Sequence, residues 1–150
     1  MQEDKICSFF GHRDVEDTQD LANKINEIVT DLIENKNVTI FWFDGYCDFS
    51  DYCLREVTKQ KDKYPYLQRK FCMSTHINDK PPKWVNLCDY DGVEHLDFFD
   101  YWYTRIYYRN CEMINQSDYV VFNITNKNSN SGAYKAYKYA KSKKARIIEI

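Results

Sequence analysis

The sequence predicts an α/β fold in which a doubly wound, mostly parallel sheet forms the middle of three α/β/α layers. Two observations lead to this expectation. Short apolar runs alternate with amphipathic segments along the chain, which is the order of repeated strand–helix–strand units. The apolar runs are also nearly continuous, as in strands that are covered on both faces. With 43% apolar residues, residues 1–150 suffice for a single domain with its own core.

The first half of the chain contains strands that alternate with helices. Residues 5–10 are an apolar run that predicts the first strand. The helix that follows can be capped by Asp17 and ends at Asn35-Lys36-Asn37, because apolar side chains recur between these points at helical spacing. These apolar residues are Leu21, Ile25, Ile28, Val29, Leu32 and Ile33. Val38 to Phe43 then predict a central strand.

The middle of the chain is less regular. We expect a second helix over residues 49–62, which Pro65 separates from a strand over residues 67–73. Residues 74–100 are expected to be irregular, because two prolines and a glycine interrupt any long element. A loop of this length inside a compact domain is often functional.

The last third of the chain returns to the alternation of helix and strand. The pattern predicts a helix over residues 100–116, a strand over 119–124, a polar loop over 125–131, a helix over 132–143 and a strand over 146–150. The inward side chains expected on the first of these helices are Trp102, Ile106 and Met113, with Tyr103 and Asn110 beside them.

The composition argues against several classes of protein. The net charge is −2 and the pI is near 5.9, which does not favour general nucleic-acid binding. No apolar run has the length of a membrane span. The first ten residues carry acids where a signal peptide carries bases, so we expect a cytoplasmic protein. The six cysteines form no CxxC pair and lack histidines at zinc-finger spacing, so we expect reduced thiols and neither a metal nor a cofactor.

The most informative segment is the glycine turn that follows the first strand, Gly11-His12-Arg13. A strand that ends in a glycine turn at the mouth of a helix can point backbone N–H groups at an anion. Arg13 adds a planar cation that suits phosphate or carboxylate. The alternative is an ordinary strand–helix turn, in which His12 binds backbone and Arg13 is solvated.

A second glycine turn, Ser131-Gly132, precedes the last helix in the same context. Ser131 can cap that helix, and Gly132 leaves room for a phosphate or a ribose. Small residues on the inner face of the helix, Ala133, Ala136 and Ala140, let it lie close to the sheet. The alternative is a capped helix that binds nothing.

Charged residues supply further candidates for ligand contacts. Arg105 and Arg109 lie four residues apart in a predicted helix, where like charges repel unless an anion lies between them. We expect an anion clamp there, although pairing of Arg109 with Glu112 on a solvated face would also explain the spacing. Asp44 and Gly45 end the second strand, where an acid suits the hydroxyls of a ribose, although turn chemistry alone also favours aspartate.

These segments together resemble the SLOG superfamily, a Rossmann-like group that joins DNA-processing DprA proteins to LOG-type phosphoribohydrolases. The likeness is greatest to its small YpsA-like branch and covers nearly the whole chain. It rests on CSFFGHR at 7–13, FWFDGYCDF at 41–49, YRNCEMINQSDYVVF at 108–122 and SGAYKAYKYAKSKKARIIEI at 131–150. The resemblance implies a Rossmann-like fold and a nucleotide-derived ligand at the strand ends, with Asn110 of the arginine–asparagine pair as a further contact. It implies no settled reaction.

The sequence departs from the enzymes of this group at one position. LOG-type enzymes carry a PGGxGTxxE stretch, and nucleoside deoxyribosyltransferases, which this segment also resembles, carry DSGTxxE. In both, the glutamate supports cleavage of an N-glycosidic bond. Counting from Gly132, that glutamate would fall at Ala136. Alanine can act neither as a nucleophile nor to stabilise an oxocarbenium-like centre, so the resemblance implies a binder that does not cleave.

Our interpretation is a protein that binds a nucleotide or an ADP-ribose-like signalling molecule without cleaving it, as a sensor or as a phage anti-defence scavenger. The alternative is a nucleotide N-glycosidase in which another carboxylate replaces the missing glutamate, the candidates being Asp44, Asp48, Asp91 and Glu94. A DprA-like binder of single-stranded DNA comes third, because the net charge does not favour it. The sequence leaves open whether the chain forms a homo-oligomer.

Overall fold

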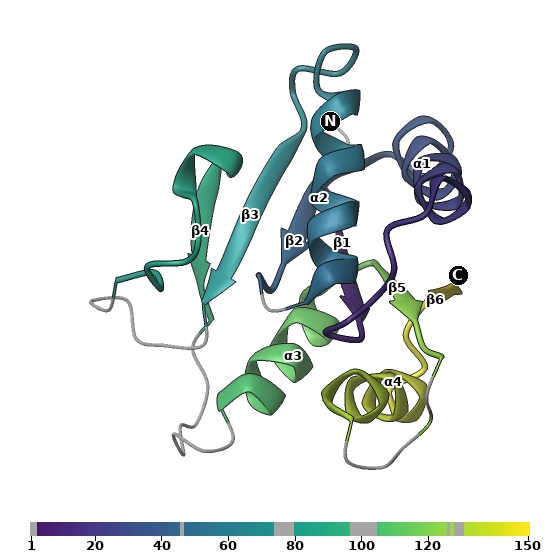
Figure 1. Cartoon of the computed structure of the whole chain (residues 1–150), viewed down its shortest axis with the longest axis vertical. Coiled ribbons are helices and arrows are strands. Elements are labelled where there is room, and N and C mark those ends of the chain that lie inside the picture. Colours follow the sequence, from purple (N-terminus) through teal and green to yellow (C-terminus); the bar gives the residue numbers. More distant parts are fainter. Residues whose placement is uncertain (1–2, 46, 74–79, 97–104, 126, 128–130) are drawn as a thin grey trace.

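The computed structural model describes residues 3–45, 47–73, 80–96, 105–125, 127 and 131–150. Within them lies a six-stranded sheet with the strand order β4-β3-β2-β1-β5-β6. Every neighbouring pair of these strands is parallel. Helices cover both faces of the sheet (Figure 1), so the predicted three-layer, doubly wound α/β architecture is confirmed.

The helices and strands follow one another much as the apolar pattern predicts. In chain order they are β1 (Lys5–Gly11), α1 (Gln19–Glu34), β2 (Val38–Phe43), α2 (Asp48–Gln60), β3 (Gln68–Met73), a 3₁₀ turn (Leu87–Asp89), β4 (Gly92–His95), α3 (Arg105–Gln116), β5 (Tyr119–Asn123), α4 (Gly132–Ser142) and β6 (Ile147–Glu149). The bounds of every strand except β4 agree with prediction to within one residue at either end.

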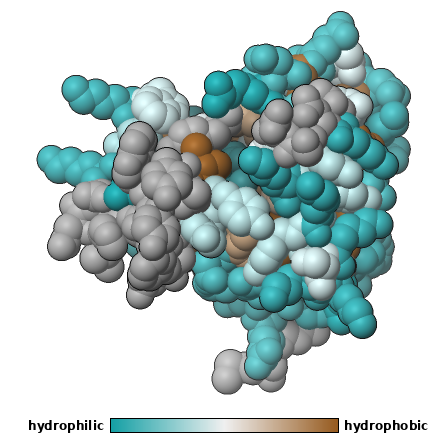
Figure 2. Space-filling model, turned by 90° about the horizontal axis from the view of Figure 1, so that it is seen from below, coloured by the Kyte–Doolittle hydropathy of each residue, from teal (hydrophilic) through white to brown (hydrophobic). Residues whose placement is uncertain are grey.

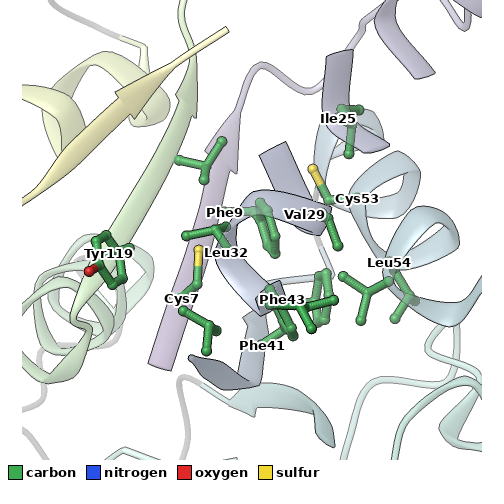
Figure 3. Packing of buried hydrophobic residues seen from close by; sticks show 14 of the residues in the cluster. Cys7, Phe9, Ile25, Val29, Leu32, Phe41, Phe43, Cys53, Leu54 and Tyr119 are labelled. Atoms are coloured by element: carbon green, nitrogen blue, oxygen red, sulfur yellow. The ribbon is translucent and has the colours of Figure 1, made fainter. Parts of the chain in front are cut away.

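Alternate residues along the central strands point to opposite faces and build two separate cores. On the face covered by α1 and α2, Phe9 stacks on Phe41 and Phe43 with ring centroids 5.9 and 5.3 Å apart (Figure 3). On the face covered by α3 and α4, Phe10 stacks on Phe122. All five rings are almost wholly buried, which explains why these strands have continuous apolar sequences.

The first helix has a different cap from the predicted one. Thr18, not Asp17, is its N-cap, and the Thr18 hydroxyl accepts a hydrogen bond from the backbone N–H of Leu21 at 3.1 Å. Asp17 instead accepts two hydrogen bonds, of 2.9 and 3.0 Å, from Arg55 on α2. Both residue types can cap a helix, and a partner distant in the sequence determines which of them does so here.

The clearest departure from prediction lies in residues 74–100, which were expected to be irregular throughout. Within them, Gly92–His95 form β4, which pairs with β3 at one edge of the sheet. This strand has only four residues and no continuous apolar run. Its sequence therefore carries little strand signal, and pairing with β3 supplies the conformation.

Helix α3 is described from Arg105 onward, so the expectations for Trp102 and Tyr103 lie outside the described residues. Met113 is buried as predicted. Ile106 is not, because 46% of its surface is exposed. It lies in the first turn of α3, which reaches the carboxyl edge of the sheet and borders a cavity there.

The coloured surface in Figure 2 is mostly hydrophilic, and its apolar residues appear as small separate areas. In the part of the chain that the structure describes, no helix combines the length and apolar character needed to cross a bilayer. The six cysteines all lie in this part as free thiols, five of them buried and Cys88 exposed.

Gly11 is required by packing rather than by its backbone angles. A Cβ atom at Gly11 would lie 2.5 Å from the Cβ atom of Phe49, in the first turn of α2. We expect Gly11→Ala to lower the free energy of unfolding by about 1–3 kcal/mol, as overpacking does, in urea denaturation. Gly132→Ala is the matched control, because a Cβ atom there meets no atom of the described residues within 4 Å. Equal stability of the two variants would contradict this account.

Candidate functional site

The carboxyl ends of β1, β2 and β5 meet the first turns of α2, α3 and α4 at one edge of the sheet, as a parallel topology requires. A cavity of about 310 Å³ opens there, which we call the carboxyl-edge cavity. It is lined by Phe10, Gly11, His12, Arg13, Asp44, Cys47, Ile106, Asn110, Ser131, Gly132 and Ala133. The structure thus brings together seven of the ten residues that the sequence singles out.

His12 links the two glycine turns across this cavity. Its Nε2 accepts a hydrogen bond from the backbone N–H of Thr125 at 3.0 Å. In the neutral ring this leaves the proton on Nδ1, which then donates to the Ser131 hydroxyl at 3.3 Å. The same hydroxyl caps α4 by accepting from the N–H of Tyr134 at 3.3 Å. His12 therefore fixes the start of α4 against the end of β1, and Ser131 caps the helix as predicted.

Arg13 is the cation of the carboxyl-edge cavity. Its carbonyl accepts a hydrogen bond from the backbone N–H of Asp48 at 2.9 Å, which holds its backbone in place. Its side chain is exposed and forms no ion pair with any residue that the structure describes. An exposed guanidinium in a cavity wall presents planar donors that suit a phosphate or a carboxylate.

Asp44 is the carboxylate of the cavity wall and is 7% exposed. Its Oδ2 lies 3.8 Å from Nη2 of Arg109, and Nη1 of Arg109 donates to the Asp44 backbone carbonyl at 3.5 Å. Arg109, which is wholly buried, also donates from Nε and Nη2 to Oδ1 of Asn110 at 3.2 and 2.8 Å. One buried guanidinium thus holds two polar groups of the cavity wall in place.

The arginines of α3 differ from the predicted anion clamp. Arg109 points into the protein, where Asp44 neutralises it, and it does not line the cavity. Arg105 is half-buried at the first residue of α3 and does not line the cavity either. Asp44 lies next to Arg109 and offsets the repulsion expected between the two arginines. Helix spacing could not predict this partner, because Asp44 follows β2 and is not part of α3.

The glycines of this edge have different reasons for being glycine. Gly45 has a φ of 73°, and a Cβ atom there would lie 2.6 Å from the Phe71 ring, so both conformation and packing require glycine. It borders a neighbouring groove rather than the carboxyl-edge cavity. At Gly132 neither φ nor packing requires glycine. Gly132 lines the carboxyl-edge cavity.

Two helix N-termini add positive potential to the cavity. Helix α4 begins at Ser131, and α2 is capped by Cys47, whose Sγ accepts a hydrogen bond from the N–H of Ser50 at 3.3 Å. Burial and the nearby Asp44 raise the pKa of the Cys47 thiol far above its usual value, so it stays protonated and is a poor nucleophile. Among the described side chains, no group of three or more could hold a metal ion.

Of the four carboxylates considered as replacements for the missing glutamate, only Asp44 lines the cavity. Asp91 lies at the amino ends of β3 and β4, on the opposite edge of the sheet. Burial opposes its ionisation, but hydrogen bonds from Arg69 and Lys61 outweigh burial and hold the pKa of Asp91 well below its usual range. The turn at residues 90–92 therefore lies away from this cavity.

Four lining residues are not predicted from the sequence as ligand contacts, namely Phe10, Cys47, Ile106 and Ala133. Three of them are apolar and give no sign of a ligand. Cys47 directly precedes α2, and this position could have identified it as the N-cap at the cavity. Cysteine is not among the usual cap residues, which are serine, threonine, aspartate and asparagine.

Comparison with known proteins gives a likeness in structure but not in sequence. The chain matches no protein-family model. No curated protein matches it either. In structure it is similar to DNA processing protein A (DprA) from Streptococcus pneumoniae, with a TM-score of 0.64 and 10% sequence identity over 97% of this chain and 50% of that one. At this identity the likeness shows the fold alone, a Rossmann-like α/β fold, and this chain spans about half the length of its neighbour.

The pair of Arg109 and Asp44 makes the cavity wall sensitive to one substitution. Arg109→Met should lower the free energy of unfolding by about 3–5 kcal/mol, because it removes a buried cation that contacts the buried carboxylate of Asp44. The double variant Asp44→Asn/Arg109→Met should recover most of this loss, since neither charge remains. Urea denaturation of the wild type, both single variants and the double variant measures the coupling. Strictly additive losses would contradict a direct interaction.

Proposed function

We propose that this protein binds a nucleotide or a nucleotide-derived, ADP-ribose-like molecule in the carboxyl-edge cavity. One observation carries the proposal: an exposed arginine and a nearly buried aspartate line the same cavity at the carboxyl ends of parallel strands. Arg13, without an ion-pair partner among the described residues, suits the phosphate. Asp44 suits the hydroxyls of the ribose.

The electrostatics of the cavity support an anionic ligand. The N-termini of α2 and α4 direct partial positive charge toward it. Arg109 offsets the charge of Asp44 from inside the protein, so the wall as a whole does not repel a phosphate. The open space at Gly132 lets such a group approach the backbone at the start of α4.

We further propose that the ligand is bound without being cleaved. Ala136, at the position of the glycosidic glutamate, is wholly buried in the core on the α3 and α4 face. The role we propose is that of a cytoplasmic sensor, or of a phage scavenger that sequesters a signal of host defence. The resemblance of the sequence to the SLOG superfamily supports this role, and the Rossmann-like fold is compatible with a nucleotide ligand.

A nucleotide N-glycosidase is the second candidate, and one observation favours it: Asp44 is a carboxylate in the cavity wall. Its ion pair with the buried Arg109 counts against a nucleophilic role, because that contact competes with a substrate for the carboxylate. Binding of single-stranded DNA, the third candidate, is favoured by the name of the structural neighbour, a DNA processing protein.

Removal of the Arg13 guanidinium tests the assignment of the phosphate. Arg13→Ala should weaken the binding of ADP-ribose and AMP by about 1.5–3 kcal/mol, the scale of a charge-assisted hydrogen bond, in isothermal titration calorimetry. Arg146→Ala is the matched control, because it removes the same charge at the opposite edge of the sheet, next to Tyr119. Equal affinities of the two variants would contradict the role of Arg13.

The absence of an acid at Ala136 predicts that the protein does not hydrolyse nucleoside monophosphates or NAD. Tight binding of a substrate does not lower the chemical barrier, so the cavity alone cannot restore catalysis. Incubation with a nucleotide panel, followed by liquid chromatography, measures the products. Turnover near about 1 per second or faster, within the usual range of enzymes, would favour the N-glycosidase, and its loss in Asp44→Asn would identify the acid.

A further inference from the structure

A second hollow adjoins the proposed site. This groove of about 520 Å³ runs along α2, and we call it the α2 groove. One stripe of α2 forms its first wall, at Asp51, Leu54, Arg55 and Thr58. Cys47, which lies one helical turn before this stripe, lines the carboxyl-edge cavity. Gly45 borders the groove and directly follows Asp44, which lines the cavity. Both hollows therefore border the turn between β2 and α2.

The opposite wall of the α2 groove is aromatic. It is formed by Trp84, Val85, Asn86, Asp89 and Tyr90, of which Trp84 and Tyr90 carry large rings. Tyr90 packs on Phe43 and Phe71, with ring centroids 6.1 and 5.5 Å apart, and is fixed by them. Trp84 borders the same groove and is 69% exposed. A fixed ring and an exposed ring on one wall suit the stacking of a flat heteroaromatic group.

The charge of the α2 groove differs from that of the cavity. Asp51 and Asp89 line it, and burial together with the charges of neighbouring aspartates raises the pKa of Asp51. Both cations that line the groove already form ion pairs. Arg55 pairs with Asp17, and Lys59 pairs with Glu56. A phosphate is therefore disfavoured here, whereas a group that donates hydrogen bonds to carboxylates is favoured.

We propose that the α2 groove binds the base of the nucleotide, and that it prefers a base with an exocyclic amine. This inference rests on the proposed function. From Arg13 through Asp44 to Trp84, the lining residues follow the order phosphate, sugar, base within a nucleotide. The ring of the base stacks on Trp84, and its amine donates to Asp51 or Asp89. These two carboxylates accept hydrogen bonds from adenine or cytosine, whereas uracil offers no amine to them.

Calorimetric titration with AMP, CMP and UMP tests the inference. We expect AMP and CMP to bind about tenfold more tightly than UMP, since the N3–H of uracil lies between two carbonyl oxygens that the carboxylates repel. Asp51→Asn should reduce this preference while changing the affinity for UMP little. Trp84→Ala should weaken AMP binding at least about fivefold, the lower limit for base stacking, and Trp84→Phe should restore most of it. Tyr66→Ala, which removes another exposed ring, is the control.

The outcomes separate this inference from the function on which it rests. Weaker AMP binding in Arg13→Ala, with unchanged binding in both Trp84→Ala and Asp51→Asn, would overturn the inference and leave the proposed function standing. Equal affinities for AMP, CMP and UMP would overturn the preference for an amine. If the wild type bound none of these nucleotides and no ADP-ribose, both proposals would be wrong.

Discussion

The candidate site depends on the buried guanidinium of Arg109. It is anchored in α3, yet it contacts the aspartate that ends β2, so it joins a helix on one face of the sheet to the edge where strands end. Loss of this cation would remove a counter-charge from a buried carboxylate, which is costly in a protein interior. The same guanidinium orients Asn110. Two polar groups of the cavity wall are therefore fixed by one side chain that does not line the cavity.

The sequence predicts the parts of this architecture that follow from local pattern. Continuous apolar runs identify the central strands, because burial on both faces imposes that composition. Parallel order then places Gly11-His12-Arg13 and Ser131-Gly132 at one edge, and the cavity lies there. Three features depend on partners that are distant in the sequence: the direction of the Arg109 side chain, the N-cap at Thr18 and the pairing of β4 with β3. Residue spacing carries no information about such partners, so these features required the structure.

The surroundings of glycine differ between the two glycine turns. A side chain at position 11 would clash with Phe49, which packs against Gly11 in the folded protein. The motif that predicts a ligand thus contains a glycine that packing alone explains. Gly132 is unobstructed by the described protein, and its neighbours form a wall of the cavity. The argument for a ligand consequently rests on Arg13, Asp44 and the open start of α4 more than on the first glycine.

The position of β1 has a consequence for how this chain folds during synthesis. β1 lies between β2 and β5, and the backbone N–H of Ile6 is bound by Asp118, 112 residues later. One edge of β1 therefore stays unpaired until β5 has left the ribosome. Contacts this distant in sequence close slowly, and exposed strand edges favour aggregation meanwhile. The centre of the sheet is encoded first but completed late, and chains cut before β5 are expected to associate rather than fold.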